Sequence, residues 1–95
     1  MVVNEKEILA AKVIERRVKF RGRERIEYVL YRERTPLRDS YSVQAIQFKH
    51  GHKICQATCR DVACDRVNAG GVFDVISEGY VEPYVLSDVV YDLLP

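Results

Sequence analysis

Two histidines and three cysteines fall in the stretch HGHKICQATCRDVACD, and both residue types are common metal ligands. Cys55 and Cys59 have the parity to share one face of a strand, which would hold them about 13 Å apart. One zinc ion holds each thiolate at about 2.3 Å, so it cannot reach both sulfurs, and the C-x2-C knuckle of zinc modules is missing. We therefore interpret both cysteines as small apolar core residues and expect no metal or cofactor. His50 and His52 are then exposed turn residues.

Cys64 differs from these two because it precedes a predicted helix. The dipole at a helix N-terminus favours the thiolate form, which makes Cys64 a candidate reactive thiol. Asp61 and Asp65 lie close by in the sequence and argue against this role, since negative charge disfavours a thiolate.

Asp88 and Asp92 are four residues apart in a predicted helix, so their carboxylates could project together for acid–base or metal chemistry. Most such pairs lie on solvated helix faces. The sequence contains no P-loop, no G-x-S-x-G, no H-E-x-x-H and no Rossmann fingerprint. We therefore predict a protein that is not an enzyme. An enzymatic or thiol-based activity through Cys64 is the third alternative.

Arginines and lysines crowd the segment from Arg16 to Arg34, around Phe20 and near Tyr28 and Tyr31. Sheets that bind nucleic acids combine cations for the phosphates with aromatic rings for the bases. The candidate phosphate contacts are Arg17, Lys19, Arg21, Arg23 and Arg25. Four glutamates are interleaved with them, which also suits a ladder of cross-strand ion pairs.

Charge is divided unequally between the two halves of the chain. Residues 12–38 hold ten Lys and Arg against four Glu, a net charge of +6. Residues 61–95 hold one Arg against seven acids, a net charge of −6. The division indicates either a self-complementary surface or two halves that fold against each other and share their charges.

Hydrophobic residues alternate with polar ones over much of residues 12–62, which is typical of strands. The first two strands read as a hairpin around Arg21-Gly22-Arg23, and Pro36 lies in the following loop. The predicted strands cover residues 12–20, 26–33, 41–49 and 54–62. Short connections favour an antiparallel meander in sequence order.

Two helices are expected after the strands. Ala69, Val72, Phe73 and Ile76 follow a helical stripe within residues 65–78, although Gly70-Gly71 weakens this helix or splits it. Pro83 opens the second helix at its first position. Residues 1–11 are predicted to form a short helical turn, with a capping box from Asn4 to Glu7, or a flexible arm. The chain is thus a single α+β domain over residues 1–95, a four-stranded antiparallel meander followed by two helices packed on one face (ββββαα).

The C-terminal segment, with the pattern V-x-P-x-x-L-x-D-V-V-x-D from Val81 to Asp92, resembles the end of an uncharacterised family of short bacterial proteins, mostly from Firmicutes. The hairpin around Gly22 is similar to the opening strands of that family. The resemblance covers about residues 12–94 and implies the fold, but no activity. The chain departs from the pattern at Ala63-Cys64, where the family has Ser or Thr.

The third strand predicts an interface. If Tyr41, Val43 and Ala45 face the helices, Ile46 and Phe48 lie on the opposite face, where an apolar pair marks a contact surface. The alternative is a bulge that returns both residues to the core. With the divided charge, this surface favours a homodimer or another protein partner.

Length and composition narrow the remaining possibilities. Ninety-five residues with 47% hydrophobic residues suit one small domain that gains from association. No apolar run reaches the roughly 20 residues of a membrane span, and three cysteines fit a reducing compartment. We therefore expect a cytoplasmic protein-interaction or regulatory module, and a nucleic-acid-binding module as the alternative.

Overall fold

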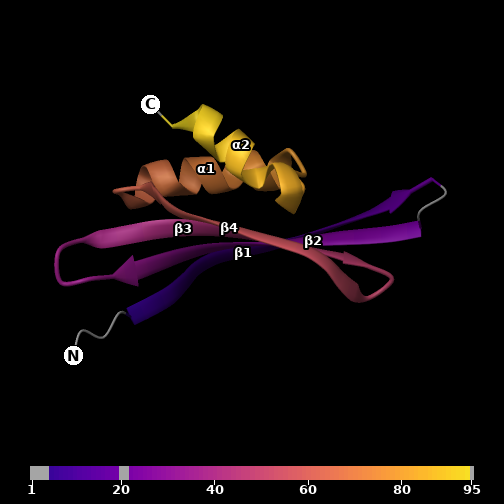
Figure 1. The fold of residues 1–95 in the computed structure, drawn as a ribbon, viewed down its shortest axis with the longest axis horizontal. Helices are drawn as coiled ribbons and strands as arrows, with labels where there is room; N and C mark the ends of the chain where they lie inside the picture. The colour runs from indigo at the N-terminus through magenta and orange to yellow at the C-terminus, as the bar shows by residue number, and fades with distance from the viewer. Residues whose placement is uncertain (1–4, 20–21, 95) are drawn as a thin grey trace.

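The computed structural model describes residues 5–19 and 22–94, which form a sheet with helices on one side (Figure 1). The strands are β1 (Glu5–Val18), β2 (Gly22–Arg34), β3 (Asp39–Lys49) and β4 (His52–Ala63). They are followed by α1 (Arg66–Glu78), a short 3-10 helix η1 (Pro83–Val85) and α2 (Leu86–Leu93). The predicted α+β fold, with four antiparallel strands followed by helices, is confirmed.

The strands pair in sequence order, and every neighbouring pair is antiparallel. Short connections explain this meander, because each strand returns directly beside the one before it. The β1–β2 turn and the β3–β4 turn consequently lie at the same end of the sheet (Figure 1). The helices lie along one face of the sheet, which we call the inner face, and the other is the outer face.

The predicted helical turn in residues 1–11 is wrong for the part that the structure describes, since β1 begins at Glu5. Pairing with β2 supplies backbone hydrogen bonds that an isolated helical turn cannot match. Glu7, expected in a capping box, lies opposite Arg32, and the two side chains form an ion pair of 2.5 Å. Hydrogen bonding to Glu7 raises the pKa of Arg32.

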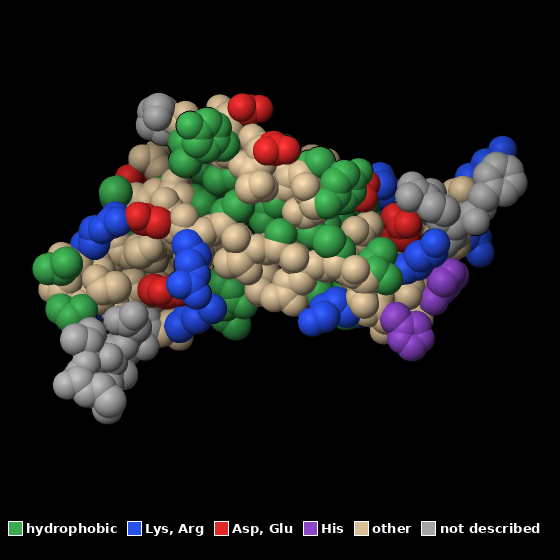
Figure 2. Space-filling model, in the orientation of Figure 1, with side chains coloured by type: hydrophobic (Ala, Val, Ile, Leu, Met, Phe, Trp, Pro, Cys, Tyr) green, Lys and Arg blue, Asp and Glu red, His purple; other side chains and the backbone are tan. Residues whose placement is uncertain are grey.

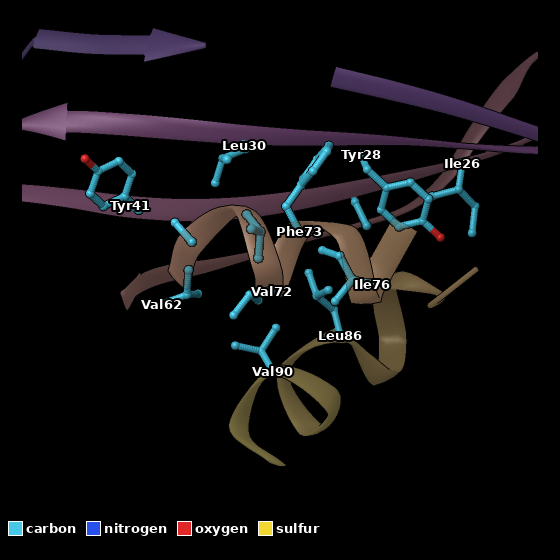
Figure 3. Close-up of a cluster of buried hydrophobic side chains, with 13 residues drawn as sticks. Ile26, Tyr28, Leu30, Tyr41, Val62, Val72, Phe73, Ile76, Leu86 and Val90 are labelled. Carbon is cyan, nitrogen blue, oxygen red and sulfur yellow. The ribbon is translucent and has the colours of Figure 1, made fainter. Parts of the chain in front are cut away.

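The inner face of the sheet carries the core that alternation predicts. Ile26, Tyr28 and Leu30 of β2 are fully buried, and Tyr41, Val43 and Ala45 of β3 pack beside them. Figure 3 shows Ile26, Tyr28, Leu30 and Tyr41 beside Val72, Phe73 and Ile76 of α1, with Leu86 and Val90 of α2 farther from the sheet. Each fully buried aliphatic side chain contributes about 2 kcal/mol, so these residues account for the association of helices and sheet.

α1 begins where the sequence can cap it. Asp65 has extended backbone angles, and its carboxylate accepts a hydrogen bond of 2.8 Å from the backbone N–H of Asn68. This bond lowers the pKa of Asp65. The helix continues unbroken through Gly70 and Gly71 to Glu78, so the glycine pair does not split it.

The second helix begins later than expected. Pro83 starts η1 rather than an α-helix, and α2 follows from Leu86. Leu86 and Val90 of this helix are buried in the core, while Asp88 is exposed.

A bulge near the end of β4 changes which side chains reach the core. Cys55, Ala57 and Cys59 alternate toward the inner face, as predicted, and are partly buried there. Asp61 then has a positive φ of 57°, at the point where the pairing with β3 shifts. The extra residue turns Val62 inward, where it is almost fully buried.

Candidate functional site

The described elements leave the outer face of the sheet without a second layer (Figure 1). Its residues form rows across the strands, since the register opposes Ala11 to Val29 and Val29 to Gln44. The next row runs from Val13 through Glu27 to Ile46. We define the central band as the aliphatic part of this face: Ile8, Ala11, Val13, Val29 and Ile46.

The alternation of β3 places Ile46 and Phe48 on this outer face. Their neighbours Ala45 and Gln47 are buried on the inner face, while Ile46 and Phe48 remain partly exposed. No bulge returns them to the core, because the β2–β3 register runs without a shift. The predicted orientation of this pair is therefore observed, and its role in an interface stays a prediction.

Two aliphatic side chains of the central band are more than half exposed to solvent. Ile8 is 63% exposed and Val13 is 56% exposed, both on β1. An apolar side chain on an uncovered face of a sheet stays in contact with water and gains little free energy from burial. Ile8 and Val13 therefore contribute little to the stability of the isolated chain. Contiguous apolar surface of this kind is typical of protein contacts.

Two described aromatic rings of the outer face, Phe48 and Tyr31, each have a cation over them. The guanidinium of Arg25 lies 4.3 Å from the ring centroid of Phe48, and the ammonium of Lys6 lies 4.2 Å from that of Tyr31. The Tyr31 hydroxyl donates to Gln44 at 2.8 Å, and Gln44 donates in turn to Thr58. Bases could stack on these rings only by displacing the cations.

Arginines gather at the end of the outer face where the two turns lie, and Figure 2 shows them there with the two histidines. Arg17, Arg23 and Arg25 border an open depression of about 500 Å³. Among the predicted phosphate contacts, Lys19 is also exposed, and Arg21 lies outside the described residues, as does Phe20. Tyr28 cannot serve as a stacking platform, because it is buried on the inner face.

Ion pairs join the positively charged half of the chain to the negatively charged half. Ion pairs between described residues of the two halves are Lys12 with Asp74 at 3.5 Å, Arg16 with Glu82 at 3.8 Å, and Arg38 with Asp61 at 2.5 Å. Arg16 lies on the inner face, opposite Glu24, and its guanidinium also stacks on Tyr80 at 3.8 Å. Ion pairs between the halves therefore explain part of the division, while at the turns Arg25 pairs with Glu27 of its own half at 3.8 Å.

Cys64 lies just before the cap of α1, on an open groove of about 800 Å³ between the end of β4, α1 and the end of α2. It is exposed, and the guanidinium of Arg38 donates a hydrogen bond of 3.5 Å to its sulfur. Arg38 is in turn held by Asp61, which raises the pKa of the guanidinium. The thiol is thus accessible beside a cation, an arrangement that the spacing of the sequence did not indicate.

The other candidates for metal or acid–base chemistry stay apart. Within residues 5–19 and 22–94, no three His, Cys, Asp or Glu side chains are placed to hold a metal ion. His50 and His52 are exposed at the β3–β4 turn, and Asp88 and Asp92 are exposed on α2. Burial raises the pKa of the Cys59 thiol, as expected for a cysteine in contact with the core.

Comparison of the chain with protein-family models, with curated proteins and with solved structures finds no significant match. None of the helices in the described part of the chain is long and apolar enough to cross a membrane. The function must therefore be argued from the outer face and from the depression at its end.

Proposed function

We propose that this chain is a small non-enzymatic protein-interaction module that forms a homodimer through the outer face of its sheet. The observation that carries the proposal is the exposure of Ile8 and Val13 on a sheet face that no described element covers. Val29 and Ile46 extend this apolar surface across two further strands. A second copy that covers the central band would remove this apolar surface from water. It would thereby enlarge the buried hydrophobic core, which is small in a chain of this length.

The outer face has the size of a dimer interface. Neighbouring strands are about 4.8 Å apart and each residue extends a strand by about 3.3 Å. Four strands of about the length of β3, which has 11 residues, therefore present roughly 700 Å² on one side. Stable protein interfaces take about 800 Å² from each partner, so one such face, pleated and bearing side chains, is sufficient.

The distribution of charge favours a second copy in one orientation. Arginines occupy one end of the outer face, whereas the opposite end carries Lys6 and Glu33, which are cross-strand partners of opposite sign. A two-fold axis lying across the strands keeps the arginines of the two copies at opposite ends of the dimer. Like charges then stay apart while the two central bands meet.

The proposal places the module in the cytoplasm, where thiols stay reduced, because all three cysteines are free. We also propose a relationship to the short Firmicute proteins, on the basis of the motif between Val81 and Asp92. A regulatory role fits a binding module of this size, and the dimer is the unit in which it would act.

Light scattering coupled to size-exclusion chromatography tests the dimer. The wild-type chain is expected to elute at about twice its mass of 11.0 kDa at micromolar concentration and above. Val13→Asp and Ile46→Asp each place a carboxylate in the central band, where burial without a partner is costly. Both variants are expected to elute as monomers with an unchanged far-ultraviolet circular dichroism spectrum.

Val67→Asp is the matched control. Val67 is 83% exposed on α1, on the side of the sheet away from the outer face, so the same change in chemistry leaves the central band intact. This variant is expected to remain a dimer. A wild-type chain that stays monomeric at 1 mM, or a Val67→Asp variant that dissociates like Val13→Asp, contradicts the proposed interface.

Nucleic-acid binding is the second candidate, and the arginines at the turns favour it. The cations over Phe48 and Tyr31 weigh against base stacking, so binding would depend on phosphate contacts and fall steeply with salt. Filter binding of a single-stranded oligonucleotide at low salt distinguishes nucleic-acid binding from a function in protein interaction alone. Retention that vanishes in Arg23→Gln supports this candidate, and the absence of salt-dependent retention removes it.

A further inference from the structure

Two arginines face each other on the outer face, in an arrangement that costs free energy. Arg17 and Arg23 are cross-strand partners at the end of the β1–β2 ladder, and both side chains are exposed. Within the described residues, neither side chain has an ion pair. Like charges directly opposite each other destabilise a sheet, and an anion between them would reverse the sign of this contribution.

The depression beside this arginine pair adds further groups that suit an anion. Its volume is about 500 Å³, and Arg25 and His50 line it together with Arg17 and Arg23. The remaining lining residues are Glu15, Gly22, Glu24, Phe48 and Gly51. Arg25 forms an ion pair with Glu27 at 3.8 Å, Glu15 lies opposite Arg25 in the register, and Glu24 lies opposite Arg16. The positive charges of Arg17 and Arg23 are therefore available to bind an anionic ligand.

His50 is held at this depression by a close fit between the two turns. Its φ is 52°, a left-handed conformation that non-glycine residues adopt at a cost of about 1 kcal/mol or more. Its ring lies so near Gly22 that a Cβ atom there would be 2.8 Å from Cε1. The β3–β4 turn therefore presents an imidazole to the arginine pair of the β1–β2 hairpin, and both ring nitrogens of an imidazole donate hydrogen bonds when it is protonated.

We infer that this depression binds a doubly charged oxyanion of the phosphate type, with Arg17 and Arg23 as its principal contacts and His50 as an additional donor when protonated. Guanidinium groups suit this ligand because their N–H groups bond two oxygens of one anion in parallel. The inference does not depend on the proposed dimer. Packed sheets are twisted and rotated by about 30° relative to one another, so the ends of the outer face stay open when the central bands meet.

Titration of the full ¹⁵N-labelled chain followed by nuclear magnetic resonance tests the site. Sodium phosphate, sodium pyrophosphate and sodium sulfate are added at pH 7, with sodium chloride at matched ionic strength as the reference. Saturable shifts are expected at the amides of residues 22–25 and 48–51 and at the arginine Nε–H groups with the three oxyanions. Arg17→Gln and Arg23→Gln are each expected to weaken binding about tenfold.

Arg34→Gln is the matched control, because Arg34 is exposed at the opposite end of β2 and should leave the affinity unchanged. Sulfate keeps its double charge between pH 5.5 and 7.5, so a pH dependence of its binding reports on the protein. Tighter sulfate binding at pH 5.5 than at pH 7.5 is expected. His50→Asn, which tolerates the left-handed conformation, should remove this difference. Besides the arginines and His50, the titratable residues that line the depression are Glu15 and Glu24.

Three results would overturn the inference. The first is that chloride reproduces the shifts, and the second is that Arg34→Gln reduces the affinity as much as Arg23→Gln does. An oligonucleotide that binds while phosphate, pyrophosphate and sulfate do not would assign the arginines to an extended phosphate backbone, with no site for a small anion. Monomeric behaviour of the wild-type chain would remove the dimer and leave the oxyanion site standing, so the two proposals fail separately.

Discussion

The hydroxyl of Tyr28, at the centre of the sheet, donates a hydrogen bond of 2.9 Å to the backbone carbonyl of Val81. Val81 belongs to the connection between α1 and η1, 53 residues further along the chain. The bond joins β2 to the segment that turns the chain from one helix to the next. Tyr28 is fully buried and Val81 is partly buried, so the bond is largely shielded from bulk water.

Tyr28→Phe is expected to destabilise the chain by about 1 kcal/mol, since the Val81 carbonyl loses its side-chain partner while the ring stays in place. Urea unfolding followed by circular dichroism measures the difference. Tyr84→Phe is the control, because Tyr84 is largely exposed and the same change should alter stability by less than about 0.5 kcal/mol. Equal effects of the two substitutions would contradict a structural role for this bond.

The burial of Tyr28 also predicts a loss of stability at alkaline pH. Burial raises the pKa of Tyr28 above its ordinary value of 10.0, and the neighbouring Tyr80 raises it further. The folded chain therefore keeps the phenol proton at a pH where the unfolded chain releases it, so stability is intact below pH 10 and falls as the pH rises beyond it. Unfolding free energies measured from pH 8 to 11 should fall less steeply in Tyr28→Phe than in the wild type.

The sequence predicted most of the fold, because the sheet depends on alternation and the helices on a 3.6-residue period. Ile26, Tyr28 and Leu30 fit an inner face at every second position, and Asp65 has the chemistry of a helix cap. The N-terminal part of β1 was missed. Its residues alternate poorly around the irregularity between Ile8 and Ala10, and only the pairing with β2 makes them a strand.

The candidate site could be predicted only in part. The outward orientation of Ile46 and Phe48 follows from alternation within one strand. Contacts between distant segments do not, and the position of His50 against Gly22 depends on two turns meeting at one end of the sheet. The cation over each outer ring likewise depends on rotamers and register, as between Arg25 and Phe48.

The three thiols are expected to react in an order set by their exposure. Cys64 is exposed, whereas Cys59 is partly buried and burial raises the pKa of its thiol. Alkylation requires an accessible thiolate, so Cys64 should be modified before Cys59 at neutral pH. Mass spectrometry of peptides from a time course with iodoacetamide gives the order. A Cys64 that reacts no faster than cysteine in a free peptide would remove the proposed reactive thiol.

Gly71→Ala is expected to stabilise the chain by about 0.5–1 kcal/mol. Gly71 lies inside α1, and a Cβ atom there would meet nothing within 4 Å, so the gain in helix propensity carries no steric cost. Thermal or urea unfolding measures it. A destabilised variant would show that this helix face contacts something that the isolated chain does not contain.

Gly22→Ala is expected to destabilise the chain for two separate reasons. The residue has a φ of +77°, which costs an L side chain about 1 kcal/mol, and the new methyl group would lie 2.8 Å from the ring of His50. Gly51→Ala isolates the backbone contribution from the contact with His50, because Gly51 has a φ of +79° and a Cβ atom there would have nothing within 4 Å. The substitution at Gly22 should therefore cost more than the one at Gly51, and the sulfate affinity should fall only at Gly22, where His50 must move. Equal losses of stability together with unchanged sulfate binding would mean that His50 does not rest against the hairpin turn in solution.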